Sequence, residues 1–149
     1  MANKSWTAAI GAAAMGIAGT WAHGALAASA EIAANPLGHF ITIAEIEHTE
    51  IRVLVDTGAS VVAMSYEDAE AAGLAPRTLT YDAPVATANG QVEGARVLLE
   101  RVMIGNVLVR DVEGIVLPKG AYDGTLLGMS FLNKLSRFRV EDGTLYLDD

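Results

Sequence analysis

The sequence predicts a mainly β domain, and three observations carry this prediction. Beyond Glu31, short apolar runs are separated by turn residues, which indicates strands. Hydrophobic residues make up 52% of the chain and charged residues 19%, which is typical of a packed core rather than of disorder. A length of 149 residues suits one domain and is too short for two lobes. We expect a closed or nearly closed barrel, because closure protects short strands from edge pairing.

The clearest strand pattern leads to an acidic residue. Ile51, Val53 and Val55 alternate with Arg52, as expected of a strand with one buried face, and Leu54 is the apolar exception. The strand therefore ends at Asp56.

Three dipeptides predict hairpin turns between the β-prone runs. They are Asn89-Gly90, Gly105-Asn106 and Asp142-Gly143, and each supplies residues that tolerate a positive φ. The second of them joins the run 97–104 to the run 107–112, which predicts one antiparallel hairpin.

Two short helices are predicted. The first covers 65–72: Ser65 can cap its free amides, Glu67 and Asp68 favour the positive end of the helix dipole, and Gly73 ends it. The second covers 130–135.

The first thirty residues differ in character from the rest. The stretch 5–30 contains no Asp, Glu, Lys or Arg, and Lys4 is the only charged side chain before it. Ala28-Ser29-Ala30 has the small-residue pattern of a secretory cleavage site, and Ala25-Leu26-Ala27 is a second candidate. The stretch is also long enough for an uncleaved membrane anchor, although Ala and Gly partition weakly into lipid. We therefore expect residues 1–30 to be a signal peptide or N-terminal membrane anchor and residues 31–149 to be an extracytoplasmic, periplasmic domain.

Composition excludes several classes of function. A net charge of -8 without a basic cluster argues against nucleic-acid binding. The absence of cysteine excludes disulfides, thiolate nucleophiles and Cys-based zinc sites. Phosphate-binding glycine loops and a serine-hydrolase elbow are also absent. We expect neither a cofactor nor a metal, since no zinc-type spacing links the candidate ligands, which are His39, Glu45, Glu47 and His48.

The run Asp56-Thr57-Gly58-Ala59-Ser60 is the segment that suggests chemistry. An apolar strand delivers the carboxylate to a turn, and Gly58 lets backbone amides approach it, so that its charge can be tuned. An Asx-type turn, in which Asp56 only accepts hydrogen bonds from its own backbone, fits the spacing equally well.

This run resembles the active-site loop of retropepsin-like aspartic proteases, and two later segments follow in the order that the family requires. Thr87-Ala88-Asn89-Gly90 resembles the tip of the flap hairpin. Leu126-Leu127-Gly128, followed by 129–132, resembles the segment that precedes the C-terminal helix. Taken alone, the former also fits an ordinary hairpin and the latter a core strand followed by a turn. The resemblance covers about 38–147 and looks closest to small bacterial membrane-linked members.

The resemblance implies a single-domain acid-protease barrel that pairs as a two-fold homodimer. The chain has one Asp-Thr-Gly, so each subunit would contribute Asp56 to a dyad that shares one proton and activates a water. The implied activity is hydrolysis of peptide bonds in an extended peptide or protein substrate, without a cofactor. Thr57 would hydrogen-bond across the dimer and Gly58 would let the backbone approach the dyad. The remaining implied residues are the substrate contacts Ala59, Ala88, Asn89 and Gly90, and the structural ψ-loop residues Leu126, Leu127 and Gly128.

Two departures from the family pattern affect the expected pH range. Met129 stands where viral relatives commonly have Arg, and Ala59 stands where pepsins usually have Ser. We expect activity at milder pH than in pepsins. A non-catalytic dimeric β-barrel that binds peptides or assembles at the membrane is the alternative, and the intact Asp56-Thr57-Gly58 favours the enzyme.

Overall fold

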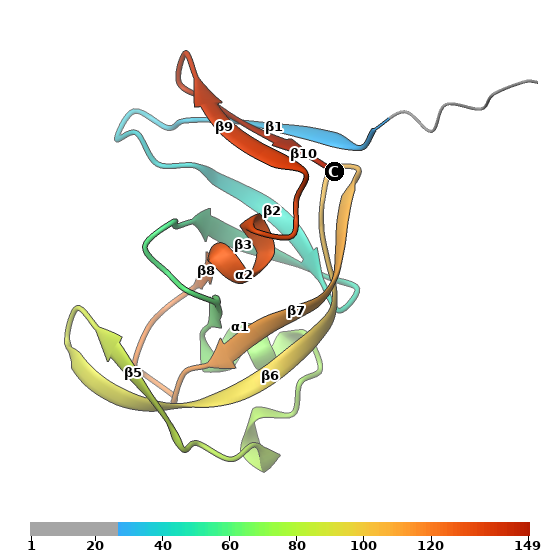
Figure 1. Cartoon of the computed structure of the whole chain (residues 1–149). Helices are drawn as coiled ribbons and strands as arrows, with labels where there is room; N and C mark the ends of the chain where they lie inside the picture. The colour runs from blue at the N-terminus through green and yellow to red at the C-terminus, as the bar shows by residue number, and fades with distance from the viewer. Residues whose placement is uncertain (1–26) are drawn as a thin grey trace, which may run out of the picture.

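A computed structural model describes residues 27–149 and shows a mainly β domain with two short α-helices (Figure 1), as predicted. The elements are, in order, β1 (Ser29–Ala33), β2 (Ile41–Ile46), β3 (Thr49–Val55), β4 (Val62–Met64), α1 (Tyr66–Ala71), a 3-10 turn (Pro76–Thr78), β5 (Ala83–Thr87), β6 (Gly90–Ile104), β7 (Val107–Val116), β8 (Thr125–Leu127), α2 (Met129–Leu132), β9 (Arg137–Glu141) and β10 (Thr144–Asp148).

The strands form two sheets. The larger has the order β2-β3-β8-β4-β7-β6-β5, and β2 also pairs with β6, which closes the sheet into a barrel. The smaller has the order β1-β10-β9. Strand β8 runs parallel to β3 and antiparallel to β4, so the segment 125–127 lies between the strands on either side of the Asp56 loop.

Both predicted helices form, with shifted bounds in the second. In α1 the Ser65 hydroxyl accepts a hydrogen bond from the Asp68 amide at 3.1 Å, and Gly73 follows with φ +78°. Helix α2 covers 129–132 instead of the predicted 130–135. The helix ends early because the Leu135 amide donates to the carbonyl of Leu132, three residues back, instead of to a carbonyl four residues back as in an α-helix.

All three predicted hairpins are present, and two differ in detail. The ribbon of β6 and β7 is longer than expected, since it continues on both strands well beyond 97–104 and 107–112. At the β5–β6 turn, Thr87 pairs with Gly90, so the turn residues are Ala88 and Asn89 instead of Asn89 and Gly90. Gly90 has φ +118° as the first residue of β6, which explains why a glycine stands there.

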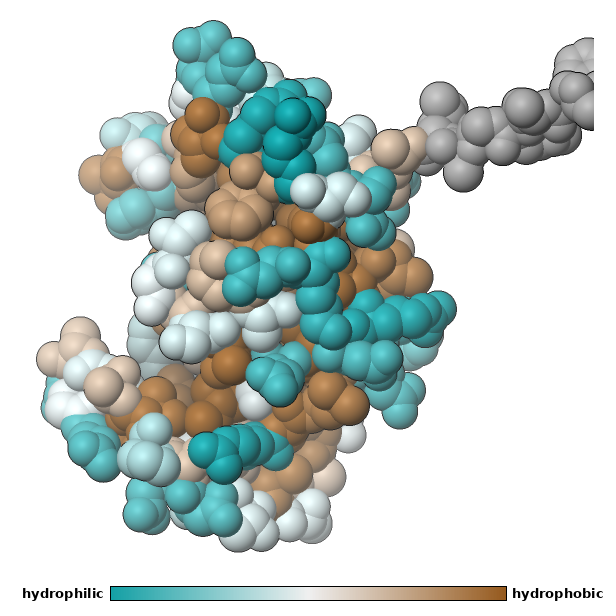
Figure 2. All heavy atoms as spheres, in the orientation of Figure 1, coloured by the Kyte–Doolittle hydropathy of each residue, from teal (hydrophilic) through white to brown (hydrophobic). Residues whose placement is uncertain are grey.

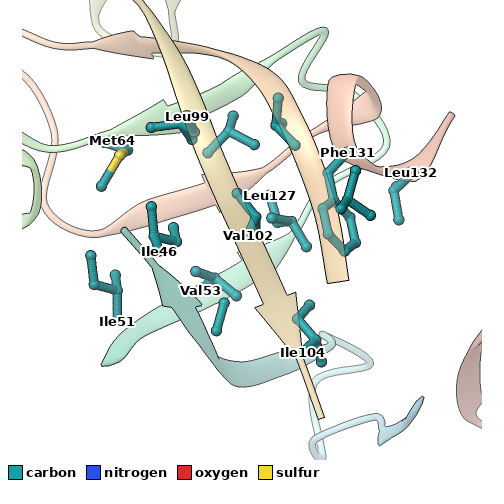
Figure 3. Packing of buried hydrophobic residues seen from close by; sticks show 14 of the residues in the cluster. Ile46, Ile51, Val53, Met64, Leu99, Val102, Ile104, Leu127, Phe131 and Leu132 are labelled. Carbon is teal, nitrogen blue, oxygen red and sulfur yellow. The ribbon is translucent and has the colours of Figure 1, made fainter. Parts of the chain in front are cut away.

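The core fills the barrel and is sealed by α2. Strand β3 alternates as predicted, with Ile51 and Val53 buried and Arg52 exposed. Figure 3 shows side chains from several strands converging with Phe131 of α2, which has no exposed surface. The largest fully buried side chains include Ile46, Met64, Leu99, Val102, Leu127 and Leu132.

The small sheet includes the start of the described chain. Ser29 pairs with Asp148 and Ala30 with Leu147, while Ile32 is buried at 4% exposure. The folded part therefore begins two residues before the boundary expected at residue 31. Residues 1–26, which carry most of the predicted leader, lie outside the described residues. Within 27–149, no helix has the length and apolar character needed to cross a membrane.

Candidate active site

Backbone hydrogen bonds at Val55 and Asp56 fix the chain at the point from which the Asp56 side chain projects. The Val55 amide donates to the Phe40 carbonyl at 2.9 Å, and the Asp56 amide donates to the Leu127 carbonyl at 3.0 Å. Val53, which precedes them in β3, is 1% exposed. The buried strand and its two neighbours therefore fix the position from which the carboxylate projects.

The turn after β3 is built around the carboxylate. The Gly58 amide donates to Asp56 Oδ1 at 2.8 Å, and the Ala59 amide donates to the Asp56 carbonyl at 3.2 Å. A β-carbon on Gly58 would lie 3.1 Å from Oδ1, so glycine permits the close approach that the sequence predicts. The Asx-type bond is thus present, but it uses one carboxylate oxygen. Among the described residues, none donates a hydrogen bond to Oδ2 of the half-buried Asp56.

The predicted ψ-loop segment lies directly against this turn. The Met129 amide donates to the Ala59 carbonyl at 2.8 Å and the Ser130 amide to the Ser60 carbonyl at 3.0 Å. A β-carbon on Gly128 would lie 2.2 Å from the Val61 carbonyl oxygen, so no other residue fits this crossing. The structure therefore brings together the Asp56 loop and the segment that contains Leu126, Leu127 and Gly128.

The predicted flap forms a hairpin that projects from the barrel (Figure 1). The Thr87 hydroxyl donates to the Gly90 carbonyl at 2.7 Å and accepts from the Asn89 amide at 3.3 Å, which stabilises the tip. Ala88, Asn89 and Gly90 are all exposed. In the part of the chain that is described, no hydrogen bond joins this tip to the Asp56 loop. Asn89 instead borders a depression of about 450 Å³, whose other lining residues are Glu67, Gly120, Ala121, Tyr122 and Asp123.

A small apolar cluster lies at the base of the flap. Ala63, Ala83, Ile115 and Leu117 are buried there, and a ring of half-buried side chains packs on them. Figure 2 shows hydrophobic residues along the inner side of the projecting hairpin. The ring links the flap to the Asp56 loop, and its members are Val61, Val85, Val92, Ala121 and Leu126.

Sequence reasoning missed this ring and three side-chain hydrogen bonds. The Thr125 hydroxyl donates to Asp68 Oδ2 at 2.7 Å, and the Ser130 hydroxyl bonds to two backbone groups. The partners are up to 68 positions apart in the sequence, so no local pattern signals them. The depression contains the predicted substrate contact Asn89, while Ala59 lies with the Asp56 loop.

The side chains of three of the four residues considered as metal ligands have other partners. Arg101 Nη1 lies 2.7 Å from Glu45 Oε1 and 2.7 Å from His48 Nδ1, and Glu47 accepts a hydrogen bond from the Glu100 amide. Within residues 27–149, no group of three or more His, Cys, Asp or Glu side chains is arranged to hold a metal ion.

A half-buried aspartate at the end of a barrel strand, with a glycine turn packed against the loop that follows it, is typical of the single-domain aspartic protease class of fold. Residues 42–134 match the family described as "gag-polyprotein putative aspartyl protease". The chain belongs to this family of retropepsin-like aspartyl proteases.

Proteins of known structure share this fold. A retropepsin-like aspartic protease from Rickettsia conorii superposes with a TM-score of 0.74 and 35% identity over 83% of this chain and 92% of that one. The EIAV protease, solved in complex with the inhibitor HBY-793, shares the fold at 19% identity, with a TM-score of 0.51 over 69% of this chain and 93% of that one.

Curated relatives share sequence over most of this chain. An uncharacterised protein of Sinorhizobium sp., encoded in the cobV 5′ region, is 44% identical over 75% of this chain and 48% of its own length. An uncharacterised protein of Rickettsia prowazekii (strain Madrid E) is 37% identical over 78% of this chain and 50% of its own length. The chain thus spans about half the length of the curated relatives it matches.

Proposed function

We propose that the protein is an aspartic endopeptidase whose active site forms when two copies each contribute Asp56. The observation that supports this most directly is the placement of Asp56: its backbone amide donates to the Leu127 carbonyl, and among the described residues none donates to its Oδ2. The 149-residue sequence contains one Asp-Thr-Gly, so a second carboxylate has to come from a second copy. In that arrangement the exposed Thr57 would bond across the two-fold axis.

The proposed reaction follows from placing two carboxylates side by side. Two carboxyl groups at close range cannot both ionise, because their negative charges would repel each other, so the pair holds one proton. The ionised carboxylate takes a proton from the bound water, whose oxygen attacks the scissile carbonyl carbon. The protonated carboxylic acid gives its proton to the carbonyl oxygen. Collapse of the tetrahedral intermediate breaks the C–N bond as the amide nitrogen is protonated, and no acyl-enzyme forms.

The proposed substrate is an extended peptide with apolar side chains near the scissile bond. The half-buried ring at the base of the flap supports this, since Val61, Val85 and Leu126 offer apolar surface between the flap and the Asp56 loop. Strand β5 pairs with β6 on one side only, so the flap also has backbone groups suited to an added strand.

The proposed location is outside the cytoplasm, after export through the uncharged N-terminal stretch. Between the two candidate cleavage positions, β1 favours the one after Ala27. A cut after Ala30 would remove Ser29 and Ala30, which pair with Asp148 and Leu147. A cut after Ala27 would leave β1 complete.

Cleavage of a diverse peptide pool by the full chain at mildly acidic pH tests the proposed activity. The comparison is between wild type and Asp56→Asn, with Asp142→Asn as the matched control. Asp142 lies in the β9–β10 turn with φ +47°, a conformation that Asn tolerates well. We expect wild type and the control to cleave and Asp56→Asn to be inactive while folded. If all three are inert although folded and dimeric, the binding-module alternative is favoured; equal cleavage by all three would refute the role of Asp56.

A further inference from the structure

The hydroxyl of Ser130 joins two segments that meet beside the active site. It accepts a hydrogen bond from the Val62 amide at 3.0 Å and donates one to the Glu113 carbonyl at 2.6 Å. The Ser130 amide also donates to the Ser60 carbonyl at 3.0 Å. One residue at the start of α2 therefore holds the last part of the Asp56 loop at two points.

The position of this bridge in the sheet explains why a hydroxyl is needed. Strands β4 and β7 pair in parallel from Val62 opposite Gly114 onward. The hydroxyl stands between the Val62 N–H and the carbonyl of Glu113, just where that pairing begins. A hydroxyl can accept from the first group and donate to the second at the same time, whereas a methyl group can do neither.

The same bridge connects the Asp56 loop to the flap. Glu113 lies in β7 opposite Leu98 of β6, and β6 runs without interruption to Gly90 at the flap tip. The binding of any substrate held between the flap and the Asp56 loop would depend on how these two segments are placed relative to each other. The ribbon of β6 and β7 is thus tied to the loop by a side chain from a third segment, α2.

We propose that Ser130 is a positioning residue that fixes the Asp56 loop relative to the β6–β7 ribbon, an inference that rests on the proposed protease function. Without the hydroxyl, the amide of fully buried Val62 loses its acceptor. A buried donor without a partner is unfavourable, so the loop has to shift to find another acceptor or a water. That shift moves Asp56 away from its placement for reaction.

Two substitutions in the full chain test this role, together with a control. Ser130→Ala removes both hydrogen bonds, Ser130→Thr keeps them, and Ser136→Ala removes a hydroxyl from an exposed position. Each variant is assayed for kcat, KM, pH dependence and folded fraction at a protein concentration that saturates dimer formation. We expect Ser130→Ala to lower kcat per folded dimer by about tenfold to a hundredfold, as for a misplaced reacting group, and to shift the acid limb of the pH profile. We expect Ser130→Thr to stay close to wild type.

The amide NMR signals of the ¹⁵N-labelled full chain provide a readout that does not need activity. We expect the Gly58 signal, which reports the bond to Asp56 Oδ1, to move in Ser130→Ala and to return in Ser130→Thr. A loss of activity matched by the loss of folded protein, with an unchanged pH profile, would overturn the inference, as would an unmoved Gly58 signal. If wild type cleaves no peptide, the proposed function fails, and the Gly58 signal alone decides whether Ser130 positions the loop.

Discussion

Gly128 passes so close to Val61 that a β-carbon on the glycine would lie 2.2 Å from the valine carbonyl oxygen. This contact marks the crossing of two chain segments, the loop that follows Asp56 and the turn that joins β8 to α2. Hydrogen bonds from the Met129 and Ser130 amides hold the crossing on either side. The position of Asp56 therefore depends on a segment about seventy residues further along the chain.

Gly128→Ala is expected to destabilise the protein by about 3 kcal/mol or more and to abolish cleavage, because backbone atoms have to separate to admit the methyl group. Urea denaturation of the variant measures the loss. Gly143→Ala is the control, since Gly143 has φ +74° but open space around it, and we expect it to lose about 1 kcal/mol from backbone strain alone. Equal stability losses in the two variants would contradict the steric account.

Thr125→Val is expected to lower the free energy of unfolding by about 1–3 kcal/mol. Thr125 is 2% exposed and its hydroxyl donates to Asp68 Oδ2, so the valine keeps the shape and leaves the carboxylate without that donor. Asp68→Asn, which retains an acceptor oxygen, should lose less. Urea denaturation of both variants provides the comparison, and a smaller loss for Thr125→Val than for Asp68→Asn would argue against this hydrogen bond as the cause.

Tyr81 is expected to ionise at a higher pH than an ordinary tyrosine side chain. Burial, and to a lesser extent the neighbouring Tyr66, raise the pKa of Tyr81, and its hydroxyl donates to the Pro76 carbonyl at 3.1 Å. A raised pKa means that the folded state holds the proton more tightly than the unfolded chain. The associated stability is complete below pH of about 10 and is lost as the pH rises through the folded-state pKa.

Ultraviolet titration of tyrosinate absorbance checks this expectation. Tyr81→Phe should remove a step that lies above the ordinary tyrosine pKa, and Tyr146→Phe, which alters the ring stacked by Arg139, should leave that step in place. If that step persists in Tyr81→Phe, it belongs to another tyrosine.

Stepwise removal of β1 is expected to lower stability in two stages. A chain that starts at Glu31 loses the pairs of Ser29 and Ala30, which we expect to cost about 1 kcal/mol. A chain that starts at Ala34 also loses buried Ile32, for a further loss of about 2–5 kcal/mol. Thermal and urea unfolding of these chains, compared with one that starts at Ala28, measure both stages. Equal stability of all three would mean that β1 contributes nothing to the fold.

Local signals in the sequence predicted local features correctly. Ser65 caps α1, Gly105-Asn106 turns β6 into β7, and Gly58 admits an amide to Asp56, since each depends on neighbours within a few residues. The β5–β6 turn was displaced by one residue, because a glycine in an Asn-Gly pair can stand in the turn or begin the strand. Local sequence alone did not distinguish these placements.

Features that depend on distant partners could not be predicted from the pattern. The placement of β8 between β3 and β4 joins segments from three parts of the chain. The Ser130 hydroxyl finds its donor 68 positions away, and nothing in Met129-Ser130-Phe131 distinguishes it from a surface serine. Ala75 has φ +49° before the 3-10 turn at 76–78, although alanine rarely adopts this conformation and gives no sign of it in the sequence.

The sheet of β1, β10 and β9 has a consequence for how the proposed dimer would be controlled. Strands β1 and β10, from the two ends of the described chain, pair with each other within a single copy, and β9 completes this three-stranded sheet. We expect folding and association of the proposed dimer to be separate equilibria, so that dilution separates the copies without unfolding them. At concentrations well below the dimer dissociation constant, catalytic output would rise with the square of protein concentration. A high local concentration of the protein would then switch on proteolysis.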